Sequence, residues 1–155
     1  MIKVFVDSDV ILDFLVGREY ADYAAVVFEI GEQSAHIQLI TSLLVVENVD
    51  FIYRQILGAL PNKKHNSRAA IAALLQHTEV VDMSGAEAKA LLSMPQLKDY
   101  EDALQLAAAR NAGAKYLITR NVKDYPHDSD VEILHAVDDV LLIRAIDVVE
   151  GSEDS

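Results

Sequence analysis

The stretch VFVDSDVILDFL, residues 4–15, is an apolar run interrupted by aspartates. The β-branched and aromatic residues at its start predict a buried strand over Ile2–Val6. Asp7, Asp9 and Asp13 follow that strand closely. Carboxylates at the end of a buried strand lose hydration and repel one another, so a bound cation or a local geometry that separates them must offset the cost. The stretch by itself leaves both explanations open.

Apolar runs of this kind alternate with longer segments of helical period along the whole chain. Predicted strands cover residues 2–6, 37–41, 78–81, 115–119 and 131–134. Predicted helices cover residues 20–32, 42–57, 67–76, 85–94 and 99–112. Alternating strands and helices predict an α/β fold, in which a central parallel β-sheet carries helices on both faces.

The chain length of 155 residues fits one domain, expected over residues 1–150, followed by a flexible acidic tail over 151–155. Its 52% hydrophobic and 25% charged residues indicate a globular protein. No apolar run approaches the roughly 20 residues that a membrane span needs. Without cysteine or a signal-peptide pattern, we expect a cytoplasmic protein.

The formal net charge of −12 argues against broad binding to phosphate backbones, which depends on lysine and arginine. Net charge does not describe a local site, however. If several acids hold a divalent cation, the charge count overstates the repulsion that a nucleic acid meets.

Four acids are predicted at one edge of the sheet, where the carboxyl ends of parallel strands form sites. Asp7 follows the first strand, Glu47 lies one turn into the helix after the second, Asp102 lies in the first turn of a later helix, and Asp124 follows the strand KYLIT. Surface acids without a shared role would be dispersed instead. Their recurrence at strand–helix junctions therefore favours a common site.

Some of the acids have ordinary structural explanations. Asp9 and Asp99 are natural helix N-caps. Asp102, three residues after Asp99, is placed to complete a pair similar to a capping box. Asp13 lies at helical spacing from Asp9, and we expect it to face solvent or to pair with Arg18.

Glu47 lies within the apolar segment LLVVENVDF, where a lone buried carboxylate would be costly and a cation would offset the cost. Oxygen ligands in a chain without cysteine favour Mg²⁺ or Mn²⁺ over Zn²⁺. The histidines form no HxH or HxxxH pair and are interpreted as surface or loop residues: His36, His65, His77, His127 and His135.

Three segments together resemble PIN-domain ribonucleases, especially VapC-type toxins of bacterial toxin–antitoxin pairs. The segments are VFVDSDVILDFLVGRE, ITSLLVVENVDFIYR and KDYEDALQLAAARNAGAKYLITRNVKDY, and they occur in the family's order and spacing. The resemblance covers essentially the whole chain. It implies a single PIN-like domain, which agrees with the α/β fold predicted from the strand and helix pattern.

The resemblance also implies roles for individual residues. Catalytic metal ligands of the family correspond by position to Asp7, Glu47, Asp102 and Asp124. Secondary candidates, which line the site or add an acid to it, are Asp9, Asp99, Thr119 and Asn121. The expected activity is metal-dependent hydrolysis of RNA phosphodiester bonds, with Mg²⁺ or Mn²⁺ activating water and neutralising charge.

RNA must still be attracted to an acidic protein. Candidate RNA-binding residues are the basic side chains of the segment KKHNSR and of loops near the predicted sheet edge: Arg18, Lys63, Lys64, Arg68, Arg120 and Lys123. The family further implies a small antitoxin protein as partner and a homodimer. Apolar helical faces such as ADYAAVVFEI could serve either partner or belong to the core.

Two other functions stay open at this point. A haloacid-dehalogenase-like phosphatase would use Asp7 as nucleophile in the motif DSDVI, with Lys123 and Asp138–Asp139 in supporting roles. That scheme leaves Glu47 and Asp102 without a role, and position 11 is Ile. A PIN-fold binding module without catalysis is the other alternative, and metal affinity without nuclease activity would identify it.

Overall fold

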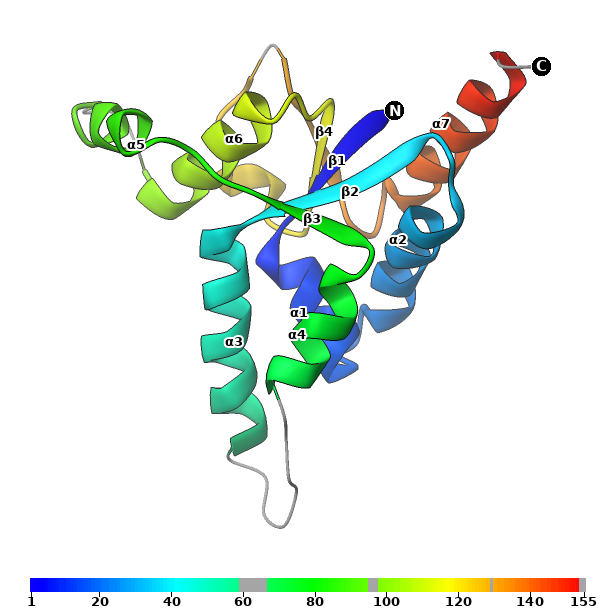
Figure 1. Ribbon diagram of the computed structural model, residues 1–155, viewed down its shortest axis with the longest axis horizontal. Coiled ribbons are helices and arrows are strands. Elements are labelled where there is room, and N and C mark those ends of the chain that lie inside the picture. The colour runs from blue at the N-terminus through cyan, green and yellow to red at the C-terminus, as the bar shows by residue number, and fades with distance from the viewer. Residues whose placement is uncertain (59–66, 95–97, 129, 154–155) are drawn as a thin grey trace.

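In this computed structural model, which describes residues 1–58, 67–94, 98–128 and 130–153, five parallel strands form the centre of the protein (Figure 1). The strands are β1 (Ile2–Val6), β2 (Ile37–Ser42), β3 (Thr78–Val81), β4 (Tyr116–Thr119) and β5 (Glu132–His135). Their order across the sheet is β3-β2-β1-β4-β5. Each strand begins and ends within one residue of its predicted bounds, so the predicted parallel sheet is confirmed.

Helices cover both faces of this sheet, as predicted. They are α1 (Ser8–Val16), α2 (Ala21–Gln33), α3 (Leu43–Gly58), α4 (Ser67–Leu75), α5 (Gly85–Leu92), α6 (Tyr100–Asn111), the short 3-10 helix η1 (Val122–Asp124) and α7 (Val140–Glu153). In Figure 1, α5 and α6 lie above the strands and α1 to α4 lie below them. Helix α7 packs beside α2. Within the described residues, no helix is long and apolar enough to cross a membrane.

Helices α1 and α7 were absent from the predicted elements. Helix α1 begins at Ser8, directly after the strand, because Asp7 is its N-cap and no turn residue separates the two elements. The sequence therefore contains no turn residue that marks the boundary between strand and helix. Helix α7 continues to Glu153, three residues past the boundary at residue 150 from which the sequence predicts a flexible tail.

The core lies between the sheet and its helices and is built from the strand interiors. Val4, Phe5 and Val6 of β1 are buried, as are Leu117 and Ile118 of β4. Strands buried on both faces are expected to be mainly apolar, and these buried stretches of β1 and β4 are. The carboxyl ends of β1 and β4 meet at one edge because the strands run parallel.

Helix α2 approaches β2 closely at one position. A Cβ atom added to Gly31 would overlap Cγ and Cδ1 of Leu39, which is fully buried. Glycine therefore sets the distance between this helix and the sheet, since interiors packed to crystal density have little room for an extra carbon.

We expect Gly31→Ala to lower the free energy of unfolding by about 1–3 kcal/mol, because overpacking outweighs the roughly 1 kcal/mol that alanine adds to a helix. Urea unfolding followed by circular dichroism measures this change. Gly85→Ala is the matched control, because a Cβ at that helix start meets no atom within 4 Å. Equal stability of Gly31→Ala and wild type would contradict the packing argument.

Candidate functional site

Asp7 is the buried carboxylate at the end of β1, with only 4% of its surface exposed. Its backbone N–H donates to the Ile118 carbonyl at 3.1 Å and so continues the pairing of β1 with β4. Its Oδ1 accepts from the Ser8 backbone N–H at 2.6 Å and from the Ser8 hydroxyl at 3.3 Å. The side chain is therefore held by the first residue of the helix that it caps.

Two buried hydroxyls reach the other oxygen of Asp7. Thr119, at the end of β4, donates to Oδ2 at 2.8 Å, and Tyr125, just after η1, donates to it at 2.9 Å. Burial raises the pKa of Asp7, and the hydrogen bonds from Thr119, Tyr125 and Ser8 oppose that shift. Asp7 and the secondary candidate Thr119 thus share one polar centre, with Tyr125 added to it.

Asp9 lies beside Asp7, one residue into α1. It is not an N-cap as predicted, because Asp7 holds that position. Its Oδ2 accepts from the backbone N–H of Arg120 at 2.9 Å and lies 3.3 Å from the hydroxyl oxygen of Thr119, whose hydrogen goes to the closer Asp7. Burial and the charge of Asp7 raise the pKa of Asp9 to about 6.

Oδ1 of Asp9 is buried and has no hydrogen-bond partner within the described part of the chain. Burying an unpartnered carboxylate oxygen is costly unless a cation or a proton compensates it. Oxygen donors of this kind suit Mg²⁺ or Mn²⁺. The side chains present therefore fit the predicted metal.

Asp102 brings the start of α6 to the same centre. Asp99 is the N-cap of this helix, as predicted, and its Oδ1 accepts from the Asp102 backbone N–H at 3.1 Å. Burial and the charges of Asp99, Asp7, Asp124 and Glu101 raise the pKa of Asp102 to about 7. Asp7 and Asp124 therefore lie close enough to Asp102 for their charges to repel its carboxylate.

Glu47 does not occupy the buried position that the sequence predicts. Its side chain is exposed on α3, so the expected desolvation cost does not arise. The next residue, Asn48, faces α6 and donates from Nδ2 to Oε1 of Glu101. Helical geometry explains the error, because adjacent residues lie on different faces of a helix and an apolar segment does not fix which face is buried.

Glu101 is an acid of the site that the sequence analysis missed. Burial raises its pKa, and the charges of Asp99 and Asp7 add to the shift. Besides Asn48, its Oε1 accepts from Nε2 of Gln105 at 3.2 Å. The run DYED places three acids around this helix start, and the capping pattern points only to Asp99 and Asp102.

Asp124 and Asn121 lie in and before η1, and both side chains are exposed. The backbone N–H of Asn121 donates to the Thr119 hydroxyl at 3.0 Å. Within the residues that the structure describes, no three acids or histidines come together in the arrangement of a complete metal site. The closest association is that of Asp7 with Asp9 through the shared hydroxyl of Thr119.

Asp13 is 1% exposed, so the expectation that it faces solvent is wrong, whereas the expected pairing with Arg18 is confirmed. Its Oδ1 accepts from Nε of Arg18 at 2.9 Å. Arg120 forms a second, bidentate pair with the same carboxylate, at 2.6 and 3.1 Å. The Arg120 guanidinium also lies 5.1 Å from the ring centroid of Tyr20. One buried aspartate therefore fixes two arginines next to Asp9.

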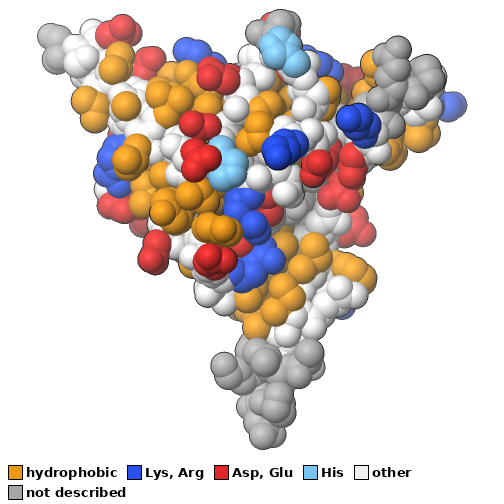
Figure 2. Space-filling view, turned by 180° about the vertical axis from the view of Figure 1, so that it is seen from behind, with side chains coloured by type: hydrophobic (Ala, Val, Ile, Leu, Met, Phe, Trp, Pro, Cys, Tyr) orange, Lys and Arg blue, Asp and Glu red, His pale blue; other side chains and the backbone are white. Residues whose placement is uncertain are grey.

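The other candidate RNA-binding residues are scattered. Lys63 and Lys64 lie outside the described residues. Arg68 is exposed at the start of α4, which Figure 1 places away from the carboxyl ends of the strands. Lys123 is exposed in η1. On the face drawn in Figure 2, basic side chains form small groups among acidic and apolar ones.

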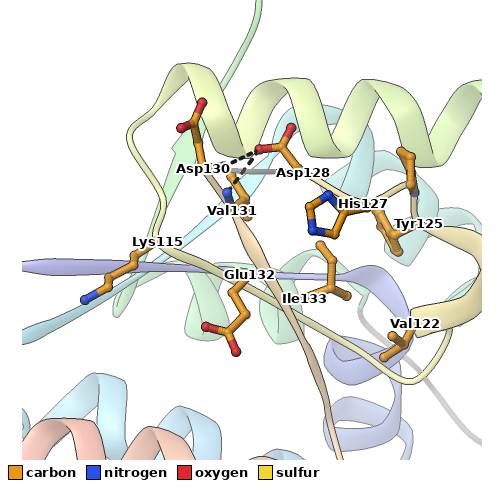
Figure 3. A pocket seen from close by; sticks show the side chains of 10 residues that line it. Lys115, Val122, Tyr125, His127, Asp128, Asp130, Val131, Glu132 and Ile133 are labelled. Carbon is orange, nitrogen blue, oxygen red and sulfur yellow. Dashed lines mark hydrogen bonds between the residues drawn. The ribbon is translucent and has the colours of Figure 1, made fainter.

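A cavity of about 500 Å³ lies beside the carboxylates, between the segment after η1 and β5 (Figure 3). Asp128 at this cavity accepts from the backbone N–H groups of Asp130 and Val131 at 2.9 and 3.1 Å and pairs with Arg110 at 2.5 Å. The cavity shares only Tyr125 with the group around Asp7. Among the described residues, Asp128, Asp130 and Glu132 are the acids that line it, and Asp128 is engaged in loop structure and in the pair with Arg110.

Comparison with known structures shows the same fold in two VapC proteins. The VapBC2 complex of Rickettsia felis, bound to a DNA fragment from its promoter, matches with a TM-score of 0.62 at 14% identity, over 86% of this chain and 98% of that one. VapC20 of Mycobacterium tuberculosis, a toxin that cleaves the sarcin–ricin loop, matches with a TM-score of 0.56 at 17% identity, over 82% and 91%.

A comparison with curated protein sequences finds no match. The family model of the PIN domain, in contrast, matches residues 3–123, which contain Asp7, Asp9, Glu47 and Asp102. This match spans most of the chain, and it agrees with the sheet, the helices and the acids at the sheet edge. The chain therefore belongs to the PIN domain family.

Proposed function

We propose that this protein is a metal-dependent endoribonuclease that uses Mg²⁺ or Mn²⁺ and is the toxin of a toxin–antitoxin pair. The observation that carries the proposal is the buried pair of Asp7 and Asp9, which share the hydroxyl of Thr119 while one Asp9 oxygen has no partner among the described residues. Membership in the PIN domain family and the fold shared with two VapC proteins support it.

The acids in the field of Asp7 would hold the cation. Asp7, Asp102 and Asp124 are the proposed ligands, with Asp9 beside them. Glu47, an exposed acid on the neighbouring helix α3, is also proposed as a metal ligand. A bound Mg²⁺ or Mn²⁺ polarises the phosphate, activates a water molecule and neutralises the leaving oxygen.

The neighbouring residues orient these acids. Thr119 contacts both Asp7 and Asp9, so its hydroxyl fixes the separation of the two carboxylates. The backbone N–H of Arg120 fixes Oδ2 of Asp9 and leaves Oδ1 available. Asn121, exposed next to Thr119, is placed to donate to a substrate phosphate.

Arg18 and Arg120 are proposed to contact the RNA backbone. The two arginines carry two positive charges and Asp13 carries one negative charge, so this group keeps a net positive charge beside the acids. Fixed guanidinium groups suit phosphate oxygens and lose little conformational entropy on binding. Lys123, Lys63, Lys64 and Arg68 complete the proposed RNA-binding set by their charge alone.

A small antitoxin and a homodimer are the proposed protein partners. The Rickettsia felis protein of the same fold was solved as a VapBC2 complex, which supports an antitoxin. The apolar face of α2 mostly belongs to the core, because Ala24, Val27, Phe28 and Ile30 are buried. On α3, Phe51 is more than half exposed and remains available to a partner.

Asp7→Asn should abolish cleavage of an RNA panel, with a loss above about 100-fold, because even residues that only support metal ligands cost 10–100-fold when changed. Wild type should cleave with Mg²⁺ or Mn²⁺ and stop when EDTA is added. Gel analysis of single-stranded and structured RNAs measures this. Asp22→Asn, an exposed acid on α2, is the control that should keep full activity.

Three other outcomes would contradict the proposed nuclease. Cleavage that persists in EDTA would exclude the metal. Turnover of small phosphoesters with a phospho-aspartate at Asp7 would support the dehalogenase-like phosphatase. Metal binding without cleavage of any RNA in the panel would support the binding module.

Arg18→Gln should raise the KM for RNA about 3- to 10-fold and change kcat less than about 2-fold, because a phosphate contact supplies binding. The salt dependence of log KM should fall by about 0.7, the value for one contact to a single strand. Arg144→Gln is the control, since Arg144 is exposed on α7 and pairs only loosely with Glu29 at 3.8 Å. An unchanged salt dependence would show that the arginine pair is purely structural.

A further inference from the structure

We propose that Tyr125, oriented by Gln105, is a positioning residue that holds the Asp7 carboxylate ready for a divalent cation. The inference rests on the proposed function only in placing a metal at Asp7. It assigns a role to two buried polar residues that the chemistry of the acids leaves unused.

The geometry around the Tyr125 hydroxyl carries this inference. The hydroxyl oxygen lies 2.9 Å from Oδ2 of Asp7 and 2.8 Å from Oε1 of Gln105. Gln105 is fully buried on α6, and Tyr125 is 7% exposed. A glutamine without solvent contact in the interior segment ALQLAAA is costly unless its polar atoms are used. Here the amide of Gln105 contacts the hydroxyl of Tyr125, which reaches Asp7 from the segment after η1.

A count of hydrogens shows which contact dominates. A phenol has one hydrogen, so Tyr125 cannot donate to Asp7 and Gln105 at the same time. The charged carboxylate is the stronger acceptor. The Nε2 of Gln105 donates to Oε1 of Glu101 at 3.2 Å, which fixes the amide with its Oε1 facing the phenol. The phenol oxygen is thus held between the Asp7 carboxylate and the Gln105 carbonyl, with its hydrogen directed to the stronger acceptor, Asp7.

The group extends from Gln105 to α3. Its amide lies 3.2 Å from Oε1 of Glu101, which also accepts from Nδ2 of Asn48. Helices α3 and α6 are therefore linked to Asp7 through Glu101, Gln105 and Tyr125. Glu101 is exposed, so the rigid part of this group is the buried pair of Gln105 and Tyr125.

The simpler explanation for Tyr125 is that its ring fills the core. The two explanations differ in the hydroxyl, because phenylalanine keeps the ring and loses only the donor. A phenol is protonated at neutral pH, so the Tyr125 hydroxyl serves as a donor there. Removing it leaves the Asp7 carboxylate free to turn between orientations, and metal ligands without such support lose affinity.

The experiment measures Mn²⁺ binding by isothermal titration calorimetry for wild type and Tyr125→Phe. We expect the dissociation constant to rise about 10-fold or more. Tyr53→Phe is the matched control, because Tyr53 is buried to the same degree on α3 and its hydroxyl has no hydrogen bond within the described residues. Its Mn²⁺ affinity should match wild type within about 2-fold, which is the scatter expected for a change remote from the ligands.

A double-mutant cycle tests the part played by Gln105. Gln105→Leu should weaken Mn²⁺ binding in the wild-type background and have little further effect in Tyr125→Phe, because both changes act through one hydroxyl. Equal effects in both backgrounds would overturn the assignment of Gln105. Urea unfolding of each variant confirms that the proteins compared are folded.

Cleavage kinetics supply a second measurement. For Tyr125→Phe, kcat should fall at low Mn²⁺ and recover at saturating Mn²⁺, with the KM for RNA unchanged. Unaltered Mn²⁺ affinity in Tyr125→Phe, or no Mn²⁺ binding by wild type, would overturn the inference. Wild type that binds Mn²⁺ without cleaving RNA would refute the proposed nuclease, and the comparison of Tyr125→Phe with wild type would still decide the role of Tyr125.

Discussion

Burial of the Asp7 carboxylate at the end of β1 is the constraint on which this site depends. A carboxylate that is 4% exposed needs several donors, and here they come from Ser8 at the start of α1, Thr119 at the end of β4 and Tyr125 after η1. Meeting that need fixes three separate segments around one side chain. The sheet brings the backbones together, and the hydrogen bonds of Asp7 set the arrangement of polar groups at its edge.

Two groups of buried acids lie next to each other and differ in how their charge is balanced. Asp13 is neutralised by Arg18 and Arg120, so it holds the end of α1 to the segment after β4. Within the described residues, no cationic side chain bonds to a carboxylate oxygen of Asp7 or Asp9, and burial raises the pKa of both. Acids kept together without a counter-charge cost stability, which is the pattern expected of a functional site. Arg120 links the two groups, since its side chain binds Asp13 and its backbone N–H binds Asp9.

The sequence predicted the fold more accurately than the site. Short runs rich in apolar residues located all five strands. The inner strands β1, β2 and β4 are largely buried, whereas the edge strands β3 and β5 each carry exposed residues. The start of α1 was missed because a helix that begins directly at the end of a strand leaves no turn signal. In the site, Asp7 and Asp102 are predicted from the sequence, and the charge of Asp7 acts on Asp102 in the structure. Glu47, in contrast, is predicted to be buried and is exposed. The identities of adjacent residues do not show which face of α3 packs against the core.

The sequence by itself determined the α/β sheet and the place of Asp7 at the end of its first strand, since these follow from periodicity and from the order of strands along the chain. Only the tertiary structure decided which polar groups meet. Asp13 with Arg120, Tyr125 with Asp7 and Gln105 with Tyr125 are pairs far apart in the sequence. Their contacts depend on how β1, β4 and α6 pack, and on the cost of leaving a buried polar group without a partner. That cost acts between elements, so no local pattern in the sequence records it.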